Sequence, residues 1–171
     1  MFVFMLGEEI PEGAPVLFRK ALRAVVWQEG RLLMVRTNKG DYKFPGGGQE
    51  PGETDAGTLV RETLEETGYR VRPSGAPLGR VVEQRTDLYD GSRYFCMTSI
   101  YYACELCDAL PCAQALSGYE VELEMRAAFV TPSEAIVANE RLLRQQIGVK
   151  RWVERETQVL RCLTEGAEGI L

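Results

Sequence analysis

The sequence predicts a single mixed α/β domain. Two observations support this prediction: strand-like segments fill much of the chain, and helical patterns interrupt and end them. The 171 residues are 45% apolar and 26% charged, which is typical of a soluble globular protein large enough to bury one core. No Pro/Gly/Ser-rich stretch divides the chain. We therefore interpret residues 1–171 as one domain, in which residues 1–15 form a loosely tied N-terminal segment.

The first predicted strands form a hairpin. Polar and apolar residues roughly alternate over residues 16–26, Gln28–Gly30 provides a turn, and residues 31–36 return as a strand with an apolar centre. A second turn at residues 38–41 leads to the glycine triplet Gly46–Gly48. Because glycine has no Cβ, the backbone of this triplet can come close to a neighbour or a ligand.

A helix is predicted after the triplet. Thr54 is a favourable N-cap, the helical pattern runs to about Thr67, and Gly68 follows at the usual position of a left-handed C-terminal cap. We expect one side of this helix to pack into the core; its residues are Ala56, Val60, Thr63, Leu64 and Thr67.

The second half of the chain continues with strands. Residues 80–88 and 93–106 have strand-like composition, and the turn-forming pair Asp90–Gly91 lies between them, which predicts a second hairpin. A loop over about residues 108–118 leads to a further expected strand near residues 120–130.

Two helices are expected to end the chain. Residues 131–134 resemble a helix start, because a proline and an acid fall in the first turn. The last helix is amphipathic, and its apolar stripe consists of Val149, Trp152, Val153, Val159, Leu160 and Leu163.

Composition limits the chemistry that is available. The chain contains no histidine, which excludes Ser-His-Asp and Cys-His nucleophiles as well as His-ligated zinc. Acid–base and metal chemistry must therefore come from carboxylates, thiols, Lys or Tyr. The net charge of −5 lacks the basic footprint of a protein that binds a nucleic-acid polymer, so such a partner is not expected.

The cysteines and the N-terminus favour a cytoplasmic location. Five cysteines are an odd number and sparse for this length, which is typical of reduced thiols. The apolar start at residues 1–6 is too short for a signal core and lacks a basic leader. No apolar run approaches the roughly 18 residues of a membrane span, so no membrane partner is expected.

The glycine triplet does not fit two common phosphate-binding motifs. Gly47 and Gly52 have P-loop spacing, but Glu53 follows where the motif needs a lysine. A dinucleotide-binding fingerprint that starts at Gly46 would need a third glycine at position 51, which is Pro51.

The helix after the triplet carries a cluster of acids. Glu62, Glu65 and Glu66 fall within an arc of roughly 100° on a helix of 3.6 residues per turn. Such an arc describes a solvated acidic face equally well. Three convergent carboxylates after a glycine-rich turn also suit a hard divalent cation such as Mg2+ or Mn2+. From spacing alone, both interpretations stay open.

The segment from residue 47 to residue 69 resembles the Nudix box of Nudix (MutT-like) hydrolases. Residues 44–48 and 51–53 also match the usual lead-in of that family. Thr63 and Tyr69 depart from the family pattern only at packing positions. The motif reads Gly47-x5-Glu53-x7-Arg61-Glu62-Thr63-x-Glu65-Glu66-x-Gly68-Tyr69.

The resemblance implies a Nudix fold, in which a mixed β-sheet is sandwiched between helices. It implies a metal-dependent pyrophosphohydrolase that uses Mg2+ or Mn2+ to split the diphosphate linkage of a nucleoside diphosphate derivative or a nucleoside triphosphate. A catalytically silent Nudix domain that senses a nucleotide ligand or binds a protein is the main alternative. Homodimers are common in the family, so a homodimer is also left open.

The resemblance assigns roles to residues of the box. Glu62 and Glu66 are the expected metal ligands, together with Glu65 and the carbonyl of Gly46. Glu65, Glu66 or an acid beyond the box is the expected general base. The remaining pair of the box, Glu53 and Arg61, is expected to orient the loop against the helix.

Other expected site residues lie outside the box. Glu120 or Glu122 is expected to add an acid, and Glu122 is taken as the metal ligand, although an edge strand with alternating Glu has the same pattern. Arg23 and Lys43 are expected to contact substrate phosphates, unless they are ordinary surface cations. Phe44 is expected to contact the substrate base, unless it packs in the core; Glu83 is a further expected contact.

Overall fold

The computed structural model describes residues 1–145 and 151–165. Val149 of the predicted apolar stripe lies outside these ranges. The strands are β1 (Phe2–Gly7), β2 (Val16–Gln28), β3 (Arg31–Arg36), β4 (Tyr42–Lys43), β5 (Val71–Thr86), β6 (Tyr94–Leu106) and β7 (Arg126–Val130). The helices are α1 (Asp55–Thr67), α2 (Tyr119–Glu122), α3 (Pro132–Gln145) and α4 (Trp152–Glu165).

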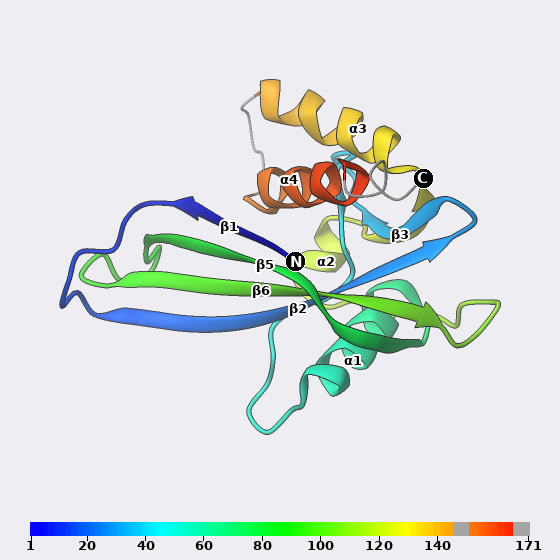
Figure 1. Ribbon diagram of the computed structural model, residues 1–171, viewed down its shortest axis with the longest axis horizontal. Helices are drawn as coiled ribbons and strands as arrows, with labels where there is room; N and C mark the ends of the chain where they lie inside the picture. Colours follow the sequence, from blue (N-terminus) through cyan, green and yellow to red (C-terminus); the bar gives the residue numbers. More distant parts are fainter. Residues whose placement is uncertain (146–150, 166–171) are drawn as a thin grey trace.

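The strands form one mixed sheet. Its order is β1-β5-β6-β2-β3-β4, and β7 pairs with β3. The β1–β5 and β2–β6 pairs are parallel and the others are antiparallel. Figure 1 shows α1 on one side of the sheet and the packed pair α3 and α4 on the other. The α/β/α arrangement that was predicted is therefore confirmed.

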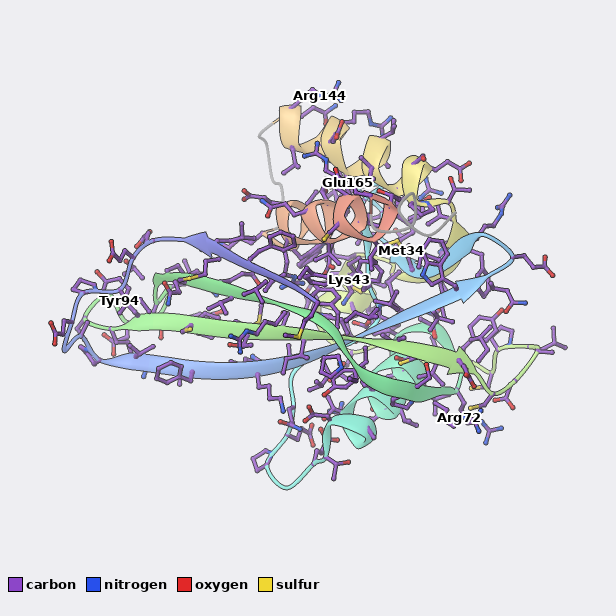
Figure 2. All side chains as sticks on the ribbon, viewed as in Figure 1. Met34, Lys43, Arg72, Tyr94, Arg144 and Glu165 are labelled. Atoms are coloured by element: carbon purple, nitrogen blue, oxygen red, sulfur yellow. The ribbon has the colours of Figure 1, made fainter. Side chains whose placement is uncertain are left out.

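The alternation of β2 separates the two sides of the sheet. Leu22 and Ala24 belong to the apolar cluster that includes Leu59 of α1. Val25 belongs to the cluster on the other side, which includes Leu160 of α4. Because successive strand residues point to opposite faces, the odd-numbered positions of β2 face the α4 side. Figure 2 shows Met34 and Lys43 among the packed side chains, whereas Arg72 and Arg144 lie at the periphery.

The N-terminal segment differs from the prediction. Instead of a loosely tied start, β1 is an edge strand in parallel register with β5, from Phe2 opposite Gly79 to Gly7 opposite Gln84. Its even-numbered side chains pack against the core cluster that contains Val81. Alternation of inward and exposed apolar side chains explains this pairing, because it suits a strand with one buried face.

The expected strand at residues 120–130 is only partly correct. The structure has the single turn α2 at Tyr119–Glu122 and starts β7 at Arg126. The N–H of Leu123 donates to Tyr119 O at 2.9 Å. This turn brings Leu123 and Met125 into a buried cluster with Val35. Packing of these two side chains therefore outweighs the strand-like alternation of the Glu residues before them. In the predicted hairpin of residues 80–106, β5 also starts earlier than expected, at Val71.

None of the helices within the described ranges is long and apolar enough to cross a membrane.

Candidate active site

The glycine triplet lies between β2 and α1. Leu22 N donates to Gly47 O at 3.0 Å, which holds the loop against β2. Gly46 has φ +135°, and a Cβ there would lie 2.0 Å from Leu22 O. A Cβ at Gly47 would lie 2.2 Å from Glu62 Oε2, and one at Gly48 would lie 2.6 Å from Arg19 Nη2. Gly46 is therefore confined by the backbone of β2, whereas a side chain at Gly47 or Gly48 would displace the end of Glu62 or of Arg19.

Helix α1 begins and ends as predicted. Thr54 Oγ1 accepts a hydrogen bond from Gly57 N at 3.1 Å. Gly68 adopts φ +77°, and its N–H donates to Leu64 O. The buried face of α1 differs from the expectation, because Ala56 is exposed while Glu66 is buried. The acidic arc therefore reaches from the surface into the interior.

Arg61 holds three carboxylates in place. Its Nε donates to Glu53 Oε1 at 2.6 Å and its Nη2 to Glu53 Oε2 at 2.8 Å, a bidentate pair. Its Nη1 donates to Glu62 Oε1 at 2.8 Å and to Glu65 Oε2 at 3.3 Å. Nη2 also reaches Gly48 O at 3.3 Å. One guanidinium thus connects the loop to the acidic face of the helix.

Two of these carboxyl groups have shifted pKa values. Hydrogen bonds from Arg61, and then from the backbone of Glu50, lower the pKa of Glu53 to about 2. Burial raises the pKa of Glu62; Arg61 opposes this, while Glu66 and Glu65 add to it by repulsion. Glu53 is therefore held as a carboxylate by its ion pair with Arg61. The ionised form of Glu62 is disfavoured, and additional positive charge nearby would stabilise it.

Glu66 is the innermost acid of the helix, with a side chain that is 1% exposed. Its Oε1 accepts from Lys43 Nζ and its Oε2 accepts from Gly46 N at 2.9 Å. The position predicted for a metal ligand is therefore occupied by an ammonium group. Within residues 1–145 and 151–165, no three acidic or thiol side chains are already arranged to hold a metal ion.

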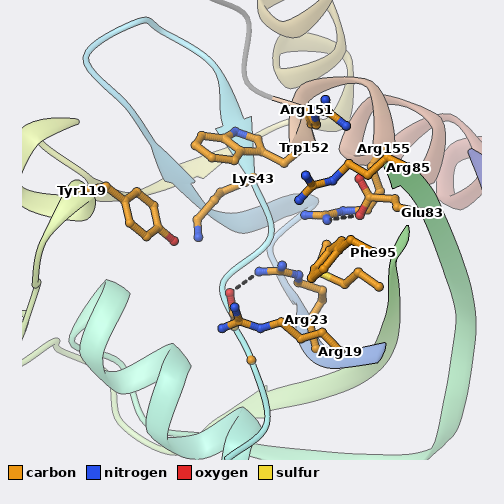
Figure 3. A pocket seen from close by; sticks show the side chains of 15 residues that line it. Arg19, Arg23, Lys43, Glu83, Arg85, Phe95, Tyr119, Arg151, Trp152 and Arg155 are labelled. Atoms are coloured by element: carbon orange, nitrogen blue, oxygen red, sulfur yellow. Dashed lines mark hydrogen bonds and ion pairs between the residues drawn. The ribbon is translucent and has the colours of Figure 1, made fainter. Parts of the chain in front are cut away.

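A cavity of about 280 Å³ opens on the other side of the glycine loop. Figure 3 shows side chains from β2, β5, β6 and the start of α4 around it. Six of the fifteen described residues that line it are cationic, and Glu83 is the only acid among them. The lining residues are Arg19, Ala21, Arg23, Lys43, Gly46, Gly47, Gly48, Glu83, Arg85, Phe95, Met97, Tyr119, Arg151, Trp152 and Arg155.

Three of the residues predicted from sequence outside the box line this cavity, namely Arg23, Lys43 and Glu83. Arg23 donates to the carbonyl of Gly46, so that carbonyl already has a partner. Glu83 forms an ion pair with Arg155 at 2.5 Å.

Two predicted residues do not reach the cavity. Phe44 is fully buried and packs edge-on against Tyr101, with 5.6 Å between ring centroids, so the predicted substrate contact is wrong. Glu122 is exposed on α2 and is not part of the cavity lining, since that turn directs Tyr119 there instead. The side chain of Glu120 accepts from Ser117 N at 2.9 Å.

Apart from Glu83, sequence reasoning missed the cavity residues that come from β5, β6 and the start of α4. Arg85 lies 4.4 Å from the ring centroid of Phe95, its register partner on β6, whereas Arg19 is in register with Met97, two residues further along β6. The sequence does place these residues at odd-numbered positions of predicted strands, which indicates that those on one strand share a face. The strand pairing needed to combine them was unknown. Trp152 was read only as a core residue, although its Nε1 donates to Asp41 at 2.7 Å beside the cavity.

The chain belongs to the Nudix family: the family's sequence model, described as "NUDIX domain", matches residues 17–155. Membership suggests pyrophosphohydrolase activity on nucleotide-type diphosphates, and the family typically uses a divalent metal ion.

Individual relatives are distant. The chain is 47% identical to "Nudix hydrolase 3" of Caenorhabditis elegans over 38 residues, which are 22% of this chain and 16% of that protein. It thus spans only a small part of this relative. A NUDIX hydrolase from Nitrosomonas europaea has TM-score 0.59 and 20% identity, covering 88% of this chain and 89% of that one. A MutT protein from Methanosarcina mazei has TM-score 0.53 and 16% identity, covering 90% and 99%. At these identities the two structures support the fold alone.

Proposed function

We propose that this protein is a metal-dependent pyrophosphohydrolase. With Mg2+ or Mn2+ it would cleave the diphosphate linkage of a nucleoside diphosphate derivative or a nucleoside triphosphate. The observation that carries the proposal is the Arg61 network, which aligns Glu62 and Glu65 beside the glycine loop. A domain that only binds a ligand has no need of such a repulsive group of acids.

The donor set fits a hard divalent cation. Glu62, Glu65 and Glu66 offer carboxylate oxygens, and Gly46 adds a backbone carbonyl. Burial is the main cause of the raised pKa of Glu62, and repulsion from Glu66 and Glu65 adds to it; a divalent cation would offset both effects. When bound, the metal would supply Lewis-acid stabilisation of phosphoryl charge and a lowered pKa of bound water. Glu66 would have to exchange its contact with Lys43 for a contact with the ion.

Glu65 is our proposed general base. Its side chain is 40% exposed, compared with 1% for Glu66, so it is the acid of the box that water reaches most easily. Arg61 keeps the Glu65 carboxylate oriented, and the absence of histidine leaves a carboxylate as the natural proton acceptor. Lys43, once released from Glu66, would be free to contact a substrate phosphate.

A nucleotide sensor without turnover is the second candidate. The observation that favours it is the buried Lys43–Glu66 ion pair, which already neutralises the innermost acid without a metal. A sensor would bind its ligand with the Lys43–Glu66 ion pair intact, whereas the proposed hydrolase must break this pair to bind the metal ion.

The test is a substrate panel assayed with Mg2+, with Mn2+ and with EDTA. The panel holds nucleoside triphosphates, nucleotide sugars, dinucleotides and ADP-ribose. We expect turnover of some members that EDTA abolishes and added Mg2+ restores. Turnover that survives EDTA would contradict the metal mechanism. Tight binding of one compound without any turnover would instead identify the sensor.

A further inference from the structure

The cavity beside the glycine loop contains a concentration of positive charge that the rest of the chain does not predict. Six of its lining side chains are cationic and one is acidic, in a protein whose net charge is −5. The basic side chains come from β2, β4, β5, the residue before α4 and α4 itself. The fold has therefore collected them from separate parts of the chain onto one concave surface.

Two of the six cations are already neutralised. Lys43 pairs with Glu66, and Arg155 pairs with Glu83 and Glu156. The other four form no ion pair closer than 4.0 Å within the described ranges; we call Arg19, Arg23, Arg85 and Arg151 the arginine wall. This wall is the part of the cavity whose cations have no ion-pair partner in the described ranges.

Arg23 is the buried member of the wall. It is 7% exposed, and its Nε has no hydrogen-bond partner in the described part of the chain. Its Nη1 donates to the carbonyl of Gly46, which fixes the guanidinium beside the glycine loop (Figure 3). A buried donor without an acceptor costs free energy, so an acceptor that arrives with the ligand would relieve that cost.

Arg85 and Arg151 form the far part of the wall. Burial lowers the pKa of Arg85, and repulsion from Arg151 lowers it further. Arg85 is also held in place by its contact with the face of Phe95. Glu83 and Asp87 act in the opposite direction on the pKa of Arg85, but neither Arg85 nor Arg151 forms an ion pair with a carboxylate in the described ranges. Two such guanidinium groups match the spread negative charge of phosphate or carboxylate oxygens.

We propose that the arginine wall selects substrates that carry an anionic group in addition to the diphosphate that is cleaved. That group is either a further phosphate in the chain or a phosphate or carboxylate on the linked moiety. This inference rests on the proposed function for the position of the diphosphate, beside Lys43 and the glycine loop. A neutral linked sugar would leave the guanidinium groups of Arg85 and Arg151 without a partner.

The test uses substrate pairs that differ by one anionic group. UTP and UDP differ by a phosphate in the chain, NADPH and NADH by a phosphate on the ribose, and UDP-glucuronate and UDP-glucose by a carboxylate. We expect kcat/KM to be at least about tenfold higher for the more anionic member of the pair that is turned over best. The best pair also identifies where the additional group lies.

Variants of the wall provide the decisive comparison. Arg85→Gln and Arg151→Gln should each lower kcat/KM for the more anionic member by about tenfold or more, and leave the other member within about twofold. Arg85→Lys should restore part of the loss, because it keeps the charge without the planar fork. Arg126→Gln is the matched control, since that exposed arginine on β7 pairs with Glu124 outside the cavity.

Binding of inorganic triphosphate and diphosphate, measured by calorimetry with Mg2+, gives an answer that does not need turnover. We expect triphosphate to bind at least about tenfold more tightly, and Arg85→Gln to abolish that preference. Equal kcat/KM within every pair, or equal loss for both members in the variants, would overturn this inference while metal-dependent hydrolysis stands. A triphosphate preference without turnover of any nucleotide would support the wall and refute the hydrolase.

Discussion

The two sides of the glycine loop differ in whether their charged side chains are paired within the protein. On the α1 side the acid cluster, which consists of Glu53, Glu62, Glu65 and Glu66, is paired throughout with Arg61 or Lys43. On the cavity side, the arginine wall has no carboxylate partner within the described ranges.

The difference shows how each side was assembled. The acid cluster comes from one helix and the loop before it, and Arg61, the partner of three of its four acids, lies on that same helix; only Glu66 pairs with a residue of another element, Lys43 of β4. The arginine wall is gathered from strands and a helix that are distant in sequence, and it is left for a ligand to neutralise. Changes on the two sides should therefore have different effects.

The largest effect should come from Glu66→Gln on the acid side. Loss of the innermost carboxylate should lower turnover by orders of magnitude, because a metal ligand and the partner of Lys43 are removed together. Steady-state kinetics measure this on the best substrate, and circular dichroism confirms folding. Glu105→Gln, at an exposed ion pair on β6, is the control and should change nothing. Near-native activity of Glu66→Gln would contradict the proposal that Glu66 is a metal ligand.

The buried ion pairs near the cavity should dominate stability. Arg155 is 2% exposed and Glu156 fully buried, so Arg155→Met should lower the free energy of unfolding by about 3–5 kcal/mol. Chemical denaturation measures the loss, and Arg155→Met/Glu156→Gln should recover part of it. The control Arg144→Met breaks an exposed pair on α3 and should cost less than about 1 kcal/mol. Equal losses in the two single variants would show that Arg155 is not held as described.

A methyl group added at Gly47, in the loop between the two sides, should lower activity much more than stability. In Gly47→Ala the added Cβ must displace the Glu62 carboxylate, and a shift of about 1 Å at a site can lower turnover by roughly 100-fold. Gly91→Ala is the matched control, because nothing lies within 4 Å of its Cβ. We expect turnover of Gly47→Ala to fall far more than its unfolding midpoint. If turnover stays unchanged, the contact between the loop and Glu62 is not needed.

The smallest effect should appear at low pH. Glu53 has a pKa of about 2 in the folded protein against an ordinary value of 4.5, so its ion pair stabilises the fold fully above about pH 4.5. That contribution should fade as the pH drops from 4.5 towards 2. Denaturation of the native protein and of Glu53→Gln across this range should show their stability difference shrinking. A difference that grows with acidity would contradict the predicted sign.

Much of the box was predictable because its interactions are local. The Thr54 cap, the Gly68 ending and the Glu53–Arg61 contact all lie within a few turns of chain. The structure also reveals what periodicity could not. Glu66 lies on the buried side of α1, where Lys43 of β4 forms an ion pair with it.

Local pattern failed where packing between distant segments decides. The alternating acids before β7 suit a strand or a helical turn, and burial of Leu123 and Met125 selects the turn. Phe44 is a second example, because it packs against Tyr101 of β6 in the core and is not exposed to a substrate.

The sequence by itself determined the α/β class, the helix of the box and the acids that belong to a Nudix hydrolase. The class follows from strand and helix patterns along the chain, the helix from its caps and periodicity, and the acids from the resemblance of residues 47–69 to the Nudix box. Only the tertiary structure decided that Arg19, Arg23, Arg85 and Arg151 share a cavity. Strand register brings Arg19, Arg23 and Arg85 to one face, whereas Arg151 is placed by the packing of α4. Both depend on long-range packing that no local pattern in the chain records.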